Sequence, residues 1–432
     1  MLYRFIRFIY SILFVSIIPC IFIKKIVNGY YNQSYNERWF ERFGKVSFRL
    51  KRSILIHSVS IGESIAVAPL VKKLSITYPD LEIVVTTMTL TGSTQVKKIY
   101  QDYSSIHHTY LPYDIPIFLN NFFKYTNPEV CIIMETELWP NLLAICHKKL
   151  IPVIITNARL SAKSVDLYKK IRFFTRNMFS HISHVNAQTN DDKKRFVSLG
   201  MQSKKIVVTG NIKYDFSVDP GIVNQASLLK ARFGKRPIWI ASSTHHNEEE
   251  IILQAHQKIQ IKYPTALFII VPRHPERFNK VYRIIKRYRF RISRRSWKSK
   301  KLDAIDVYLA DTMGEMMLFY AVSDIVFVGG SFSGTGGHNM IEPSALSKVI
   351  ITGPSTFNFS EVIKFLLRNK ALIITENAQE LADNIVRLFQ EKREHTMMGR
   401  RAFSCYNQNR GALNTQFRFI RQLVDEKKMA IH

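Results

Sequence analysis

Residues 54–64 read ILIHSVSIGES, and this stretch decides the fold class. An apolar run long enough for a short strand leads into a turn of small residues, and Gly62 permits a tight bend there. Apolar residues then recur at three- and four-residue spacing through 66–74, which is typical of a helix. A strand that runs through a tight turn into a helix is the repeating unit of a parallel sheet covered by helices. The stretch therefore predicts an α/β protein.

The same alternation continues along the chain in two blocks. In the first block, strands are expected at 54–58, 83–87, 130–134, 153–156, 185–188 and 206–209. A polar stretch follows, with a turn expected at Asp219-Pro220-Gly221. In the second block, strands are expected at 238–241, 267–271, 307–310, 325–328, 349–352 and 372–375. We therefore predict two doubly wound, Rossmann-like domains that face each other across a cleft, with the chemistry in loops after strands.

The N-terminus has the pattern of a membrane anchor. Arg4 and Arg7 precede an uncharged run at 8–23, which ends at Lys24-Lys25 and approaches the length of a membrane span. No small-x-small cleavage site follows, which disfavours a signal peptide. Basic residues accumulate after the run, so the remainder is expected on the cytoplasmic side of the membrane. A helix that lies on the membrane surface without crossing it is the alternative.

These patterns predict the following organisation of the chain. The expected parts are a membrane anchor (1–27), an N-terminal Rossmann-like domain (28–215), a linker (216–236), a C-terminal Rossmann-like domain (237–410) and a C-terminal helix (411–432).

The charge balance favours partners that carry phosphate. The 432 residues have a formal net charge of +29, although a solvated basic surface is the simpler alternative. Basic and aromatic residues are dense at 280–301, a pattern that suits single-stranded nucleic acid or anionic lipid, and the anchor favours lipid. The four cysteines are widely separated and form no C-x-x-C pair, which disfavours zinc and disulfide frameworks.

Acidic residues follow two of the first-block strands. Glu63 lies at an expected helix start, where an acid can be catalytic or can simply offset the helix dipole. Glu135 and Glu137 directly follow an apolar strand and could form an acid/base pair, a metal site or the acidic start of a helix near Pro140. Lys213 follows a later strand and is a candidate charge for an anion, or an ordinary surface lysine.

The second block offers two anion-binding patterns. Arg273 and Arg277 follow a strongly apolar strand and suit forked recognition of phosphate or carboxylate. The glycine-rich stretch 329–339 precedes a helical segment and is expected to hold phosphate through free N–H groups, with Glu342 placed to accept from sugar hydroxyls. It is neither a Walker loop nor a dinucleotide fingerprint.

Metal-binding patterns are absent from the sequence. There is no H-E-x-x-H motif and no Asp-x-Asp triplet, and His181 and His184 are interpreted as ordinary, partly buried residues.

An ordered set of motifs resembles the Kdo transferases, which move 3-deoxy-D-manno-octulosonic acid (Kdo) from CMP-Kdo to a lipid A precursor. The motifs are HSVSIGES, TTMTLTGS, LPYD, METELWPN, NARLS, VPRHPERF, DTMGE, VGGSF and GGHN…EP, and they cover essentially the whole chain. The resemblance implies a GT-B fold, inversion at the anomeric centre, and no metal or cofactor. The chain departs from the family at Met340-Ile341, where Pro-Leu is common, which puts the local loop shape in doubt.

The resemblance also implies roles for individual residues. Glu63 matches the family's general base, and Glu135 and Lys213 match residues that stabilise the transition state. The positions that match CMP-contacting segments are Pro272, Arg273, Met313, Gly314, Glu315, Asn339, Met340, Ile341 and Glu342. Arg273 and the Gly336-Gly337 turn are expected to hold the phosphate of the departing CMP.

The implied partners are CMP-Kdo, a phosphorylated glycolipid acceptor (lipid IVA) and the anionic inner membrane, without nucleic acid. Two rival functions remain at this point: another GT-B nucleotide-sugar transferase or epimerase, and a non-enzymatic basic protein that binds membranes or nucleic acid.

Overall fold

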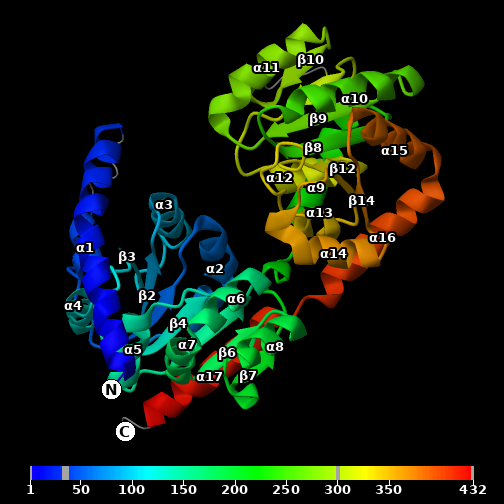
Figure 1. Cartoon of the computed structure of the whole chain (residues 1–432). Helices are drawn as coiled ribbons and strands as arrows, with labels where there is room; N and C mark the ends of the chain where they lie inside the picture. The colour runs from blue at the N-terminus through cyan, green and yellow to red at the C-terminus, as the bar shows by residue number, and fades with distance from the viewer. Residues whose placement is uncertain (1, 32–37, 298–301, 430–432) are drawn as a thin grey trace. The chain divides into compact units, whose positions relative to one another are not determined.

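The computed structural model describes residues 2–31, 38–297 and 302–429, and the chain divides into two compact units. Unit 1 comprises Met1–Asp215 and Arg410–His432, and unit 2 comprises Phe216–Asn409. The C-terminal helix α17 (Ala412–Met429), drawn in red, therefore belongs with the N-terminal part of the chain (Figure 1).

Unit 1 contains a seven-stranded parallel sheet in the order β3-β2-β1-β4-β5-β6-β7. Its strands are β1 (Ser53–His57), β2 (Glu82–Thr87), β3 (Ile106–Tyr110), β4 (Pro128–Met134), β5 (Val153–Ala158), β6 (His184–Ala187) and β7 (Ile206–Val208). The sequence prediction missed β3, an edge strand whose sequence IHHTY contains two half-buried histidines in place of a continuous apolar run.

Helices cover both faces of this sheet. They are α1 (Leu2–Tyr31), α2 (Ile61–Thr77), α3 (Leu90–Ile99), α4 (Pro116–Thr126), α5 (Pro140–Lys148), α6 (Ala162–Lys170), α7 (Arg172–Ser180), α8 (Asn190–Ser198) and α17, with short 3-10 turns η2 (Trp39–Phe43), η3 (Ser203–Lys205) and η4 (Ile212–Tyr214).

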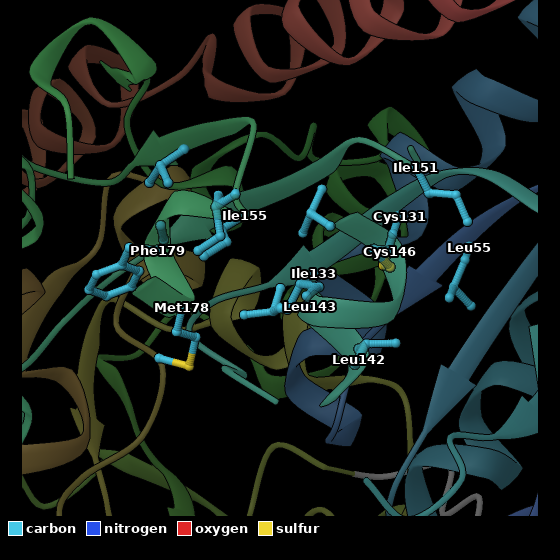
Figure 2. Packing of buried hydrophobic residues seen from close by; sticks show 14 of the residues in the cluster. Leu55, Cys131, Ile133, Leu142, Leu143, Cys146, Ile151, Ile155, Met178 and Phe179 are labelled. Carbon is cyan, nitrogen blue, oxygen red and sulfur yellow. The ribbon is translucent and has the colours of Figure 1, made fainter. Parts of the chain in front are cut away.

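Alternating residues of the central strands supply two hydrophobic cores. Leu55 and Cys131 belong to one cluster, and their neighbours Ile54 and Ile132 belong to the other, because successive side chains of a strand point to opposite faces. Figure 2 shows the first cluster, in which residues of β1, β4 and β5 pack against α5 and α7. This rigid sheet fixes the strand ends that carry the candidate site.

Helix α1 packs along unit 1 on one side. The rings of Tyr3 and Phe174 lie 5.2 Å apart between centroids, and Asn141 Nδ2 donates a hydrogen bond to Ser11 Oγ over 2.9 Å. Figure 1 shows α1 (dark blue) running beside the helices of this unit.

The other side of α1 is apolar and exposed. The segment Leu2–Ile23 is long and apolar enough to cross a membrane. Its exposed apolar side chains are those of Leu2, Phe5, Phe8, Ile9, Ile12, Leu13, Val15, Ile17, Phe22 and Ile23. A contiguous apolar surface of this kind is consistent with membrane association.

Unit 2 contains a second seven-stranded parallel sheet, in the order β10-β11-β9-β8-β12-β13-β14. Its strands are β8 (Ile238–Thr244), β9 (Leu267–Pro272), β10 (Ile292–Arg294), β11 (Val307–Leu309), β12 (Ile325–Val328), β13 (Val349–Thr352) and β14 (Leu372–Ile374). The sequence prediction missed β10, a three-residue edge strand with only one buried residue.

The helices of unit 2 also cover both faces of its sheet. They are α9 (Pro220–Phe233), α10 (Glu248–Lys262), α11 (Phe278–Arg287), α12 (Met316–Val322), α13 (Ile341–Ala345), α14 (Ser360–Arg368), α15 (Ala378–Gln390) and α16 (Lys392–Gln408), with 3-10 turns η5 (Pro275–Arg277), η6 (Arg295–Trp297) and η7 (Phe357–Phe359). The basic stretch 280–301 spans α11, β10 and η6, and its last four residues lie outside the described part of the chain.

The expected linker at 216–236 is mostly helix. Asp219 caps α9 by accepting from the N–H of Gly221, and Pro220 is the first helical residue. Asp-Pro-Gly suits a turn, but Asp and Pro are equally suited to the N-cap and first position of a helix. Leu229 and Phe233, four residues apart, are buried in unit 2, so burial of this apolar face decides in favour of the helix.

Candidate active site

Glu63 lies in the first turn of α2, immediately after β1. Ser60 is the N-cap residue, and its hydroxyl accepts from the N–H of Glu63. The Glu63 carboxylate in turn accepts from the N–H of Val59 and from Ser60 Oγ, both over 2.8 Å. This reciprocal arrangement is a variant of the capping box in which the backbone donor is Val59 instead of the N-cap Ser60, and it positions the half-buried carboxylate firmly at the strand end.

Glu135 and Lys213 meet from two different strand ends. Lys213 Nζ lies 2.9 Å from Oε1 of Glu135, and Arg159 Nε lies 2.9 Å from Oε2. Glu135 has a left-handed backbone (φ 56°), uncommon for a residue with a side chain, and its N–H donates to Thr156 O over 3.0 Å. Such a conformation is retained where surrounding contacts fix it, often at functional sites.

Burial and neighbouring charges push the pKa values of the two glutamates apart. Burial acts to raise the pKa of Glu135, but Lys213 and Arg159 outweigh it and hold the pKa below its usual value. Burial raises the pKa of Glu63, the bonds from Val59 and Ser60 offset this only in part, and the negative charge of Glu135 adds to the increase. Glu63 is therefore the better proton acceptor, and Glu135 stays ionised beside two cations.

Glu137 is a third acid at the same place. Burial, together with the charges of Glu63 and Glu135, raises its pKa to about 7. The sequence left open whether Glu135 and Glu137 form an acid/base pair, a metal site or a helix start. Because Lys213 and Arg159 occupy Glu135, it stays ionised, whereas a pKa of about 7 leaves Glu137 about half protonated near neutral pH.

In unit 2, the arginines after β9 differ in their environments. Arg273 is exposed, and no ion pair is recorded for it among the described residues. Arg277 Nη2 binds Glu249 over 3.0 Å, while its Nη1 is buried without a hydrogen-bond partner. Pro272, the last residue of β9, is buried and fixes the start of this loop. Of the two arginines, Arg273 is therefore the one whose guanidinium is open to an anion from solvent.

The glycine-rich turn after β12 corrects one expectation. The N–H groups of Gly330, Ser331 and Phe332 all donate to the buried carboxylate of Glu248, over 2.7 to 2.9 Å, so they are not free for phosphate. The N–H of Gly337 donates to Gly330 O over 2.8 Å and is also occupied. An internal carboxylate therefore holds the turn in shape.

The remaining candidate residues of unit 2 follow β11 or lie beyond the glycine-rich turn after β12. Glu315 pairs with Arg295 over 2.6 Å, and this guanidinium lowers the pKa of Glu315. Glu342 accepts from Asn339 Nδ2 over 3.1 Å, and burial raises its pKa. Met313 is exposed, and Gly314 has a left-handed backbone with open space beside it.

The side chains of Met340 and Ile341 are buried in unit 2. The N–H of Ile341 donates to Asn339 Oδ1 over 3.0 Å, and Met340 O accepts from Ser344 Oγ over 2.7 Å.

The structure also bears on the histidines and on metal binding. His181 caps the end of α7 and His184 begins β6, so the two do not share a helix face, and both are partly buried. Among the described residues, no group of three or more His, Cys, Asp or Glu side chains could hold a metal ion.

Sequence reasoning missed several residues of the site. They are Arg159, His245, Glu248 and Arg295, while His338 lay within the predicted stretch 329–339 without a role of its own. Glu248 is one of three consecutive acids at the start of α10, which resemble ordinary charges that offset a helix dipole. Their partners come from other strand ends, so only the sheet order reveals the contacts.

Comparison with known proteins agrees with these features. Residues 37–216 match the family model described as "3-Deoxy-D-manno-octulosonic-acid transferase (kdotransferase)", and residues 236–404 match "Glycosyl transferases group 1". Solved structures share the fold of the chain at low identity. A glycosyltransferase from Rickettsia africae has a TM-score of 0.57 at 15% identity and covers 87% of this chain and 99% of its own.

Curated relatives match over most of their length. The 3-deoxy-D-manno-octulosonic acid transferase of Haemophilus influenzae is 40% identical over 94% of this chain and 96% of its own, and that of Bordetella pertussis is 30% identical over 84% and 86%. These matches confirm the resemblance found in the motifs and disfavour an epimerase or a non-enzymatic protein, and the two α/β units are of GT-B type. The chain belongs to the Kdo transferase family, the glycosyltransferases that transfer Kdo in lipopolysaccharide biosynthesis.

Proposed function

We propose that the chain transfers Kdo from CMP-Kdo to the lipid A precursor lipid IVA, with inversion at the anomeric carbon and without a metal ion. The observation that carries this proposal is the arrangement after β1, β4, β5 and β7. Glu63 is half-buried with a raised pKa, beside a Glu135 that is paired with Lys213 and Arg159.

In the proposed reaction, Glu63 accepts the proton of the acceptor hydroxyl while that oxygen attacks the anomeric carbon. The Val59 and Ser60 donors hold the Glu63 carboxylate in place, and each of its oxygens keeps a lone pair for the incoming proton. The charged groups of Glu135 and Lys213 are held in place before the reaction. They can therefore stabilise the charge that develops in the transition state without moving. CMP leaves with the electron pair of the broken bond, and Arg273 supplies positive charge for its phosphate.

Residues of unit 2 are proposed to hold the donor. Gly314 has open space beside its main chain, and the half-buried carboxylate of Glu342 suits hydroxyl groups of a sugar. The exposed apolar face of α1 is proposed to hold the enzyme at the inner membrane on the cytoplasmic side, where the net positive charge of the chain favours a phosphorylated glycolipid.

The direct test is to incubate the full chain with CMP-Kdo and lipid IVA and to weigh the lipid products. The proposal expects a mass increase by one or more Kdo residues. UDP-sugars in place of CMP-Kdo are expected to give no product. Transfer from a UDP-sugar, or no transfer from CMP-Kdo, would contradict the donor assignment.

A further inference from the structure

Two histidines of unit 2 share a hydrogen bond. His245 directly follows β8, and His338 ends the glycine-rich turn after β12. Their Nε2 atoms lie 2.7 Å apart, the ring planes differ by 8°, and the ring centroids lie 5.0 Å apart. The two rings are parallel, and their nitrogens are in contact although their centroids lie far apart. The rings therefore meet edge to edge and share an N–H···N hydrogen bond.

This hydrogen bond limits how many protons the pair can carry. One of the two nitrogens must lack a proton in order to accept. The bond therefore exists when both rings are neutral, and it persists when one further proton makes one ring an imidazolium. A second added proton would break it. The pair is thus suited to take up a single proton without losing its geometry.

Glu248 fixes the two chain segments that carry the histidines. Its buried carboxylate accepts from the N–H of His245 over 2.8 Å and from three N–H groups of the glycine-rich turn. Gly330 lies against the other ring, because a Cβ atom there would come within 2.8 Å of His338 Cδ2. The pair is therefore held by main-chain contacts.

The charged groups that face the pair are mainly cationic. Arg273 and His274 face both histidines, while Arg277 and the carboxylate of Glu248 face His245. Burial, with the neighbouring cations, lowers the pKa of His338 to about 4, and burial also lowers that of His245. Without a ligand the pair is therefore neutral near pH 7, and a bound anion would favour protonation.

We propose that the His245–His338 pair belongs to the donor site and takes up one proton when the nucleotide phosphate leaves. This inference rests on the proposed CMP-sugar donor. Breaking the bond between the anomeric carbon and the phosphate oxygen leaves the electron pair on that oxygen. The phosphate then changes from one negative charge to about two, because the second pKa of a phosphate monoester is about 6.

Two protons move in the proposed step, and they go to different groups. One proton from water converts the pair to an imidazole–imidazolium pair, and a ring N–H donates to the phosphate oxygen. The proton of the acceptor hydroxyl goes separately to Glu63. No oxidant or metal takes part.

Calorimetry with CMP tests the proposal on the full-length protein in detergent. Binding is measured at pH 7.5 in two buffers of different ionisation enthalpy, which yields the number of protons taken up. We expect uptake of roughly half to one proton by the wild type, and CMP binding about tenfold weaker, with little uptake, in His338→Gln and His245→Gln. His246→Gln is the matched control, because His246 is adjacent and exposed, and it should behave like the wild type.

A second measurement needs no variant. If only the CMP phosphate ionised, CMP binding would strengthen as pH rises from 5 to 7 and would stay constant above pH 7. Protonation of the pair in the complex instead weakens binding between pH 7 and 8.5, by at most about tenfold per pH unit. CMP binding without proton uptake, or a CMP affinity that stays constant above pH 7, would overturn the proposed role of the pair and leave the donor assignment intact. No CMP binding by the wild type would overturn the donor assignment as well.

Discussion

Lys213 Nζ lies 2.9 Å from Oε1 of Glu135, although the two residues follow β7 and β4, which are separated in the sheet by β5 and β6. The left-handed backbone of Glu135 and the 3-10 turn that begins at Ile212 bring the two side chains together above the intervening strands. Because Arg159 binds the other carboxylate oxygen, Glu135 is neutralised from both sides.

Replacing Lys213 by Met should reduce turnover roughly ten- to hundredfold, because the fixed positive charge beside Glu135 is lost. Stability should change by no more than about 1 kcal/mol, since Lys213 is partly exposed. Steady-state rates and thermal unfolding measure the two effects. Lys230→Met, which removes a similar ion pair with Asp324, is the control and should leave turnover unchanged. Equal turnover in both variants would assign Lys213 a structural role.

Glu137→Gln should stabilise the protein above pH 7. The folded-state pKa of Glu137 is about 7, above the usual 4.5, so the folded chain holds a proton that the unfolded chain releases. Stability is therefore lost as pH rises from about 4.5 to 7, and glutamine removes this loss. We expect the melting temperature of unit 1 at pH 8 to rise by roughly 2–4 °C, the change that about 1 kcal/mol produces in a unit of roughly 150–250 residues, and the difference to vanish near pH 4. Glu361→Gln, at an exposed position, should show no such pH dependence.

Much of the fold could be predicted because its strands are apolar runs between turn signals. Each expected strand has a counterpart within a few residues, and the positions of Glu63, Glu135 and Lys213 after strands followed from the rule for parallel sheets. The edge strands β3 and β10 were missed, since an edge strand needs less apolar sequence. The helix α9 was missed because its start also suits a turn.

The contacts within the site were harder to predict, because they join residues far apart in the sequence. The motif GGSF suggested free N–H groups for phosphate, yet Glu248 accepts from three of them across 82 to 84 positions. Nothing in a run of three glutamates distinguishes the buried Glu248 and Glu249 from the exposed Glu250, or shows which of them meets the turn. That distinction depends on the pairing of β8 with β12.

Activity should persist after treatment with EDTA. A divalent metal would need the Glu135 and Glu137 carboxylates, but Lys213 and Arg159 already occupy Glu135. We expect full turnover in the chelator and no gain from added magnesium or manganese. Loss of turnover that either metal restores would contradict the metal-free reaction and make the two glutamates ligand candidates again.

Membrane attachment should depend on the exposed face of α1. Deleting the helix would uncover residues it packs against, so substitution is the sharper test. Changing Phe5, Ile9 and Ile12 together to Gln should release folded protein from membranes in high salt, because salt weakens only electrostatic attachment.

A control replaces exposed apolar residues elsewhere, at Ile76, Leu228 and Ile261, and this protein should stay in the membrane pellet. Release of the wild type by salt alone would show that the apolar face of α1 does not hold the enzyme.

Glu63→Gln separates the capping role of this residue from its proposed catalytic role. Glutamine can still complete a capping box, so stability should fall by no more than about 1 kcal/mol. An amide cannot accept the proton, so turnover should fall on the order of a hundredfold or more while CMP-Kdo binding persists. Glu380 occupies the same position in the capping box of α15, and Glu380→Gln should match the stability change without the loss of turnover. Near-normal turnover of Glu63→Gln would reduce Glu63 to a cap and make Glu137, with its pKa of about 7, the next candidate base.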